Sequence, residues 1–217
     1  WLGMTFSNDP FFVETATNMM MQSREAVVNY MTPLGLAHIM GTGHHYGPAP
    51  WVADLGRPEW NPYYYHGANA EGIGFDRTAK GSNAVAQYSR AVANRFASLE
   101  TVPDEYLLWF HRLPWDHPMR SGNTLWQELV AHYDRGVSEV EAMHVSWTGL
   151  KRFVDPERFA KRSRLLDVQL REARWWRDAC IAYFMHQSGK ELPRGVRPPA
   201  ESLVYYQSLQ FPYAPGN

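Results

Sequence analysis

The chain has 217 residues, which is enough for one sizeable hydrophobic core and too few for a large multidomain enzyme. Hydrophobic residues make up 45% and charged residues 20% of the sequence, a composition that excludes a wholly disordered chain. The 21 basic and 22 acidic residues give a formal net charge of -1, which argues against a general nucleic-acid binder. No apolar run is long enough to span a bilayer, so we expect no membrane partner.

The ends of the chain and its cysteine content bear on its cellular context. The sequence begins at Trp1 with no signal-peptide pattern, so we expect a fragment whose upstream part would carry any such signal. The one cysteine, Cys180, excludes an intrachain disulfide framework and favours a reducing compartment.

The first part of the chain predicts a helix followed by a long irregular stretch. Asn8 or Asp9 can cap a helix whose first turn holds Pro10, and the turn at 32–35 should end or kink that helix. Residues 41–80 are rich in Gly, Pro, His and aromatic residues and have no sustained period. Such a long loop is usually functional, and it leaves room for a few short strands.

More helical pattern follows from residue 81. We expect a helix over 81–100 with Asn83 as a cap, and a second helix that starts at 102–105 and stops near Pro114. Two long helices over 122–153 and 155–188 should form an antiparallel pair. We expect their packing to include an aromatic seam, whose members are Trp126, Trp147 and Trp176.

The remaining 28 residues, 190–217, predict a short helix near 201–209 and then an extended arm. The predicted fold class is therefore mainly α, and α+β at most. It is an irregular multi-helix domain with a long antiparallel helix pair, an aromatic-rich loop region and a C-terminal arm.

Two segments combine aromatic faces with hydrogen-bonding groups and are candidates for ligand contact. The segment 41–51 contributes His44, His45 and Tyr46. The segment 109–116 contributes Trp109, His111, Arg112 and Trp115. Structural packing explains either segment as well as ligand contact does, so both interpretations stay open.

Several kinds of chemistry lack a matching pattern. No His-Glu-x-x-His or Cys-x-x-Cys spacing is present, so we expect no metal and no other cofactor. Inverting glycoside hydrolysis requires two carboxylates about 6.5–9.5 Å apart, and no spacing marks such a pair. We therefore assign no catalytic residue to the chain. The acids in aromatic, loop-rich surroundings are Asp54, Glu71, Asp76 and Asp116.

Seven motifs, in order along nearly the whole chain, resemble the C-terminal region of the α-glucuronidases of glycoside hydrolase family 67. These motifs are Asn29–Leu36, Gly43–Pro48, Gly72–Thr78, Gly81–Val85, Trp109–Asp116, Gly122–Trp126 and Glu172–Asp178. The resemblance implies removal of 4-O-methyl-glucuronic acid, α-1,2-linked to xylose, from xylooligosaccharides during xylan degradation, with inversion. It also implies a bacterial protein that is cytoplasmic rather than secreted.

The resemblance further implies how the polypeptide is organised. Family members have a β-rich N-terminal domain, a (β/α)8 barrel with the catalytic carboxylates, and a helical C-terminal region that packs on the barrel and supplies a homodimer interface. Residues 1–42 would be the last helical elements of the barrel, and 43–217 the helical C-terminal domain. We therefore expect this chain to be inactive alone. Its expected partners are the missing domains, a second copy and a xylooligosaccharide bearing glucuronic acid.

Two other functions fit the same residues. The chain could be a free-standing carbohydrate-binding or protein-interaction module, which upstream sequence without a barrel would indicate. It could also be a small complete enzyme with His44 or His45 as general base. However, the sequence has no residue at a recognisable spacing that would orient either imidazole.

Overall fold

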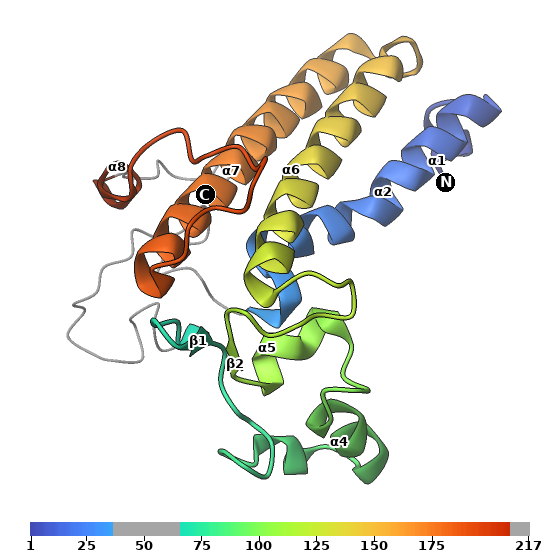
Figure 1. The fold of residues 1–217 in the computed structure, drawn as a ribbon. Coiled ribbons are helices and arrows are strands. Elements are labelled where there is room, and N and C mark those ends of the chain that lie inside the picture. Colours follow the sequence, from blue (N-terminus) through green and yellow to red (C-terminus); the bar gives the residue numbers. More distant parts are fainter. Residues whose placement is uncertain (37–65, 209–217) are drawn as a thin grey trace.

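The computed structural model describes residues 1–36 and 66–208, shown as a coloured ribbon in Figure 1. The candidate segment 41–51 and the arm after residue 208 lie outside the described residues. The described elements are α1 (Leu2–Thr5), α2 (Pro10–Met31), the 3-10 turn η1 (Pro33–Gly35), β1 (Gly72–Ile73), η3 (Ala84–Gln87), α4 (Arg90–Ala97), η4 (Asp104–Tyr106), α5 (Leu107–Phe110), β2 (Leu113–Pro114), α6 (Leu125–Gly149), η5 (Lys151–Phe153), α7 (Pro156–Ser188) and α8 (Leu203–Ser208).

The fold is mainly α, as predicted. Its described strands are two residues long, and β1 pairs antiparallel with β2 so that Ile73 lies opposite Leu113. The strands and the short helices α4 and α5 gather at one end of the molecule, below the long helices in Figure 1. None of the helices in the described ranges is long and apolar enough to cross a membrane.

The predicted antiparallel pair of long helices is confirmed as α6 and α7. A capping box starts α6, because the Thr124 side chain accepts from the Gln127 backbone N–H and the Gln127 side chain accepts from that of Thr124. Asp155 caps α7 by accepting from the backbone N–H of Arg158. Gly189 ends α7 in the left-handed conformation, with φ of +67°, that glycine adopts readily.

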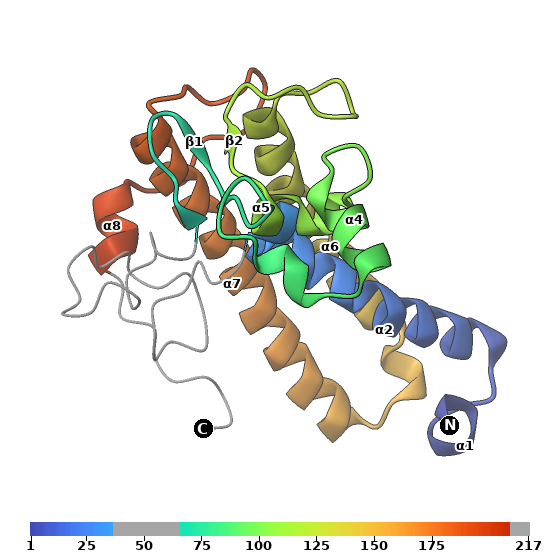
Figure 2. The ribbon, with the colours of Figure 1, turned by 90° about the horizontal axis from the view of Figure 1, so that it is seen from below.

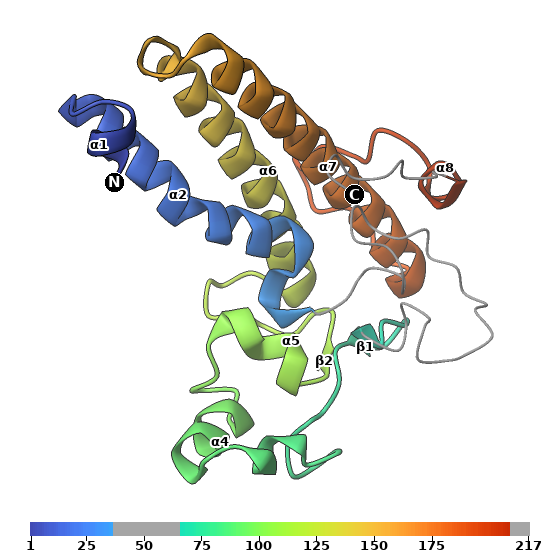
Figure 3. The ribbon, with the colours of Figure 1, turned by 180° about the vertical axis from the view of Figure 1, so that it is seen from behind.

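Helix α2 packs across this hairpin. Of the two predicted caps, Asp9 is the one that caps α2, accepting from the backbone N–H of Phe11 at 2.9 Å. Figure 3 shows that the C-terminal half of α2 crosses α6, whereas the N-terminal half of α2, next to α1, lies farther from the hairpin. Because Tyr30 of α2 belongs to the same core as Tyr133 of α6, the described α2 and α6 share one packed interior. The domain division at residue 42 stays a prediction.

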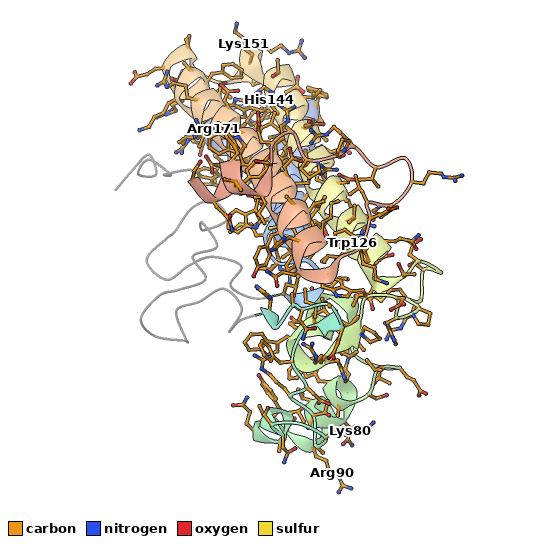
Figure 4. The ribbon with its side chains drawn as sticks, turned by 60° about the vertical axis from the view of Figure 1, so that its left-hand side comes forward. Lys80, Arg90, Trp126, His144, Lys151 and Arg171 are labelled. Atoms are coloured by element: carbon orange, nitrogen blue, oxygen red, sulfur yellow. The ribbon has the colours of Figure 1, made fainter. Side chains whose placement is uncertain are left out.

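The buried apolar side chains form two clusters. The larger one joins α2, α6 and α7 to the strands and α5, and it includes Trp115, Leu125 and Phe184. The smaller one lies near the hairpin tip and is built on Phe12 and Leu150. Figure 4 marks the long axis of the molecule, from Lys151 at the tip past Trp126 to Arg90 at the opposite end.

The predicted aromatic seam along the hairpin is wrong. Trp126 meets the ring of Trp115, Trp147 stacks on Phe159, and Trp176 meets the edge of Tyr30. Trp126 and Trp147 are 21 positions apart, which is roughly 30 Å of α-helix. The three indoles therefore lie at separate levels and pack against different partners.

The predicted helix over 81–100 is also only partly correct. It is divided into η3 and α4, and Asn83 precedes η3 in a left-handed conformation without a capping hydrogen bond from its side chain. Three of its apolar side chains, Tyr88, Val92 and Leu99, are 41%, 37% and 40% exposed. The next helix, expected to reach Pro114, ends at Phe110, and the chain then enters β2.

The different burial of Trp176 and Trp147 leads to a prediction about stability. Trp176 is only 2% exposed in the main cluster, so Trp176→Ala should lower the free energy of unfolding by about 3–5 kcal/mol. Trp147 is half-buried in the smaller cluster, so Trp147→Ala should cost less. Urea unfolding followed by far-UV circular dichroism measures both variants. A loss below about 1 kcal/mol for Trp176→Ala would contradict this packing.

Candidate functional site

The candidate segment 109–116 runs from α5 through β2 and lies against residues 66–78. The ladder between β1 and β2 brings the two stretches together, as Figure 2 shows from below the hairpin. One further backbone bond extends the contact, because the Arg77 N–H donates to the Phe110 carbonyl. Within residues 66–78, the Gly74 N–H donates to the His66 carbonyl. We call these two stretches the loop layer.

Arg112 holds the loop layer from within. Its Nη1 donates to the carbonyl of Gly67 at 2.6 Å and to that of Gly74 at 3.3 Å, and its Nη2 donates to Oδ1 of Asn69 at 2.8 Å. The same Asn69 oxygen accepts from the backbone N–H groups of Glu71 and Gly72. The planar guanidinium thus ties three points of residues 67–74 together, a geometry that lysine cannot reproduce.

Trp115 is buried under the same loop. Its side chain is 1% exposed, and its Nε1 donates to the Asn69 carbonyl at 2.7 Å. The ring contacts Trp126 of α6 and Phe184 of α7. Trp115 therefore joins the loop layer to the base of the hairpin.

His111 and Trp109 join the loop layer to neighbouring groups, and His111 is buried. His111 Nε2 lies 2.8 Å from the Phe96 carbonyl and donates to it, and burial lowers the pKa of this imidazole. Trp109 is half-buried, with the Arg77 guanidinium 4.1 Å from its ring centroid. It also lines a small pocket of about 320 Å³ beside Arg24 and Glu105.

His66 is a buried polar residue of the loop layer that sequence analysis missed. Its Nδ1 accepts from the Ala68 backbone N–H at 2.9 Å, so the ring proton lies on Nε2, 3.1 Å from the Tyr183 hydroxyl. Burial lowers the pKa of His66 to about 3, which keeps the ring neutral. The preceding residues have no period, so nothing in the sequence marks a contact with α7, 117 positions away.

The loop layer is thus a rigid support, and its polar groups are engaged with one another. Arg112 and Trp115 bind backbone and core within the chain, whereas Trp109 lines an open pocket. Among residues 1–36 and 66–208, no group of three or more His, Cys, Asp or Glu side chains could hold a metal ion. Contact with a substrate stays a prediction for these residues. His44, His45 and Tyr46 lie outside the described part of the chain.

The pKa of His66 leads to a prediction about pH. Below pH 6.5 the unfolded chain binds a proton that folded His66 does not, so stability is lost as the pH falls from 6.5 toward 3. At pH 5 this loss is about 2 kcal/mol. His66→Gln should therefore reduce the pH dependence of the unfolding free energy between pH 7.5 and 5 by about that amount.

Urea unfolding at several pH values measures this effect. The matched control is His186→Gln, which removes an exposed histidine of α7 and should keep the pH dependence of the parent chain. If His66→Gln also kept it, the buried neutral imidazole would be excluded.

Comparison with known proteins identifies the family. Residues 1–197 match the family described as glycosyl hydrolase family 67 C-terminus. The chain is 36% identical over 195 residues to a probable alpha-glucuronidase A of Aspergillus clavatus, covering 87% of this chain and 22% of that protein. The alpha-glucuronidases A of Emericella nidulans and Aspergillus tubingensis are 35% and 36% identical, with the same coverage. The chain thus spans about a fifth of the length of these relatives. It belongs to the C-terminal family of glycosyl hydrolase family 67.

Proposed function

We propose that this chain is the C-terminal domain of an inverting α-glucuronidase that removes (4-O-methyl)-glucuronic acid, α-1,2-linked to xylose, from xylooligosaccharides. In this proposal the chain packs on the upstream catalytic part, shapes the substrate pocket and contributes to a homodimer. The family match and the names of the relatives support the reaction class. The observation that best supports the packing role is an apolar groove near the start of the chain.

The groove lies between α1 and α2 on one side and α7 on the other, with a volume of about 770 Å³. Its apolar lining comes from both sides, and its rim on α7 carries three cations, Arg158, Lys161 and Arg162, and one acid, Glu157. Trp1 and Met20 line it while 75% and 62% exposed. Large exposed apolar surfaces of this kind mark contact sites, because soluble monomers rarely leave them uncovered.

The position of the groove favours the upstream part of the same polypeptide as its occupant. This chain matches a C-terminal region, and Trp1 lines the groove, so any residues that precede Trp1 would start beside it. An occupant with an apolar face and acidic neighbours would match both the lining and the cationic rim. The loop layer, held internally by Arg112 and Trp115, would then support the pocket without taking part in bond cleavage.

Two adjacent methionines of α2 test the groove in the full-length polypeptide. Met20 lines the groove, whereas Met21 is 76% exposed and does not. Met20→Glu would bury a carboxylate on docking, which is unfavourable. We expect it to lower kcat/KM for a glucuronic acid-bearing xylooligosaccharide about tenfold, equivalent to about 1.4 kcal/mol. Calorimetry should show the C-terminal region unfolding in a separate, earlier transition.

Met21→Glu is the matched control, since it adds the same charge one residue away. It should leave kcat/KM within about twofold and keep a single unfolding transition. Equal effects of the two variants, or no effect of Met20→Glu, would exclude the groove as the docking surface.

A further inference from the structure

A second cleft lies on the opposite side of the hairpin from α2. It has a volume of about 710 Å³ and is bounded by α6, α7 and residues 197–206. Figures 1 and 3 show α8 beside α7 on the side away from α2. This volume is within the range of sites that bind small ligands. The apolar groove and the loop layer are built from other residues, so the cleft is a separate feature.

The floor of the cleft is a buried ion pair whose hydrogen-bonding groups are engaged. Arg177, 1% exposed, donates from Nε to Asp134, from Nη1 to Asp178 and from Nη2 to the Arg197 carbonyl. Asp178, 3% exposed, also accepts from Arg197 Nη2 and from the backbone N–H of Ala200. Because both charges are compensated within the protein, the floor does not require an ion as ligand.

The walls offer donors and acceptors of both signs close together. Glu141 of α6 and Arg174 of α7 form an exposed ion pair at 2.7 Å. The Ser138 hydroxyl donates to the Asp134 carbonyl at 3.0 Å and keeps its oxygen as an acceptor. Glu201 adds a further acceptor from the opposite side. Neighbouring charges of opposite sign disfavour a strongly charged ligand, whereas a hydroxyl group can both donate and accept.

The cleft also contains aromatic side chains. Tyr205 of α8 lines it while 39% exposed, and its ring meets that of Tyr206 edge-on at 5.4 Å. The Tyr206 hydroxyl in turn donates to Asp178 at 3.4 Å, which fixes Tyr206, the ring neighbour of Tyr205, against α7. A half-buried Trp175 lies on the facing helix. Flat aromatic surfaces beside polar groups suit a ring with one apolar face and a hydroxylated edge.

We propose that this cleft binds a neutral oligosaccharide, namely an unsubstituted stretch of the xylan main chain. Its mixed charges contact the sugar hydroxyl groups, and Tyr205 packs on the C–H face of a xylose ring. The choice of xylose rests on the proposed function, whereas the preference for a neutral, hydroxyl-rich ligand rests on the cleft itself. Such a site would hold a xylooligosaccharide by unsubstituted xylose units away from the bond that is cleaved.

Isothermal titration of linear xylohexaose into the 217-residue chain tests this site. Xylohexaose carries no glucuronic acid, so its binding does not depend on cleavage. We expect a dissociation constant of about 1 mM or lower, and at least about tenfold weaker binding for Tyr205→Ala. Tyr88→Ala is the matched control, because Tyr88 is 41% exposed and lies between η3 and α4. Its binding should stay within about twofold of the parent chain.

Two further measurements complete the test. Ser138→Tyr fills the cleft from α6 and leaves α8 unchanged, and we expect it to abolish binding. It therefore tests the cleft even if Tyr205→Ala perturbs the short helix α8. Hexagalacturonic acid, a sugar chain with a carboxylate on each ring, should bind at least about tenfold more weakly than xylohexaose. Undetectable xylohexaose binding, binding insensitive to both cleft variants, or a preference for the anionic chain would each overturn the proposal. The proposed function is tested separately, by the glucuronidase activity of the full-length polypeptide. The outcome of the xylohexaose titration does not decide it.

Discussion

The close backbone contact between α2 and α6 at Gly136 is the constraint on which the described fold most depends. A Cβ at this position would lie 2.6 Å from the Tyr30 nitrogen and 2.8 Å from the Tyr30 Cβ. The absence of a side chain lets α2 approach closely enough for Asn29, 1% exposed, to bond both His132 and Glu139 of α6. Buried polar groups need such partners, so this crossing has one favoured register.

The functional surfaces follow from this crossing. Toward its N-terminus α2 leaves the hairpin and borders the apolar groove proposed as the docking surface. Toward its C-terminus it continues into η1, where Gly35 has φ of +81° and a Cβ would lie 2.9 Å from the Tyr106 backbone. That second close contact positions η4, and α5 carries the chain directly into the loop layer. A single packing geometry therefore relates the apolar groove to the loop layer.

Local signals in the sequence predicted the elements that local interactions determine. The cap at Asp9, the start of α7 near residue 155 and its end at residue 188, and the antiparallel hairpin are all of this kind. The site was harder to predict, because its partners are distant in sequence: Trp115 bonds a carbonyl 46 positions away, and His66 meets a tyrosine 117 positions away. Composition marked 109–116 as rich in hydrogen-bonding groups, but whether those groups meet a ligand or their own backbone depends on tertiary packing.

Two glycines of α6, Gly136 in its interior and Gly149 at its C-terminal end, provide the most direct test of the fold. Gly136→Ala would place a methyl group against backbone atoms of α2, whereas no atom lies within 4 Å of a Cβ at Gly149. Urea unfolding should show Gly136→Ala to be destabilising by about 1–3 kcal/mol, the range for overpacking a core. Gly149→Ala should be neutral or stabilise the chain by up to about 1 kcal/mol, through helix propensity alone. Equal stability of the two variants would contradict a fold organised around the contact at Gly136.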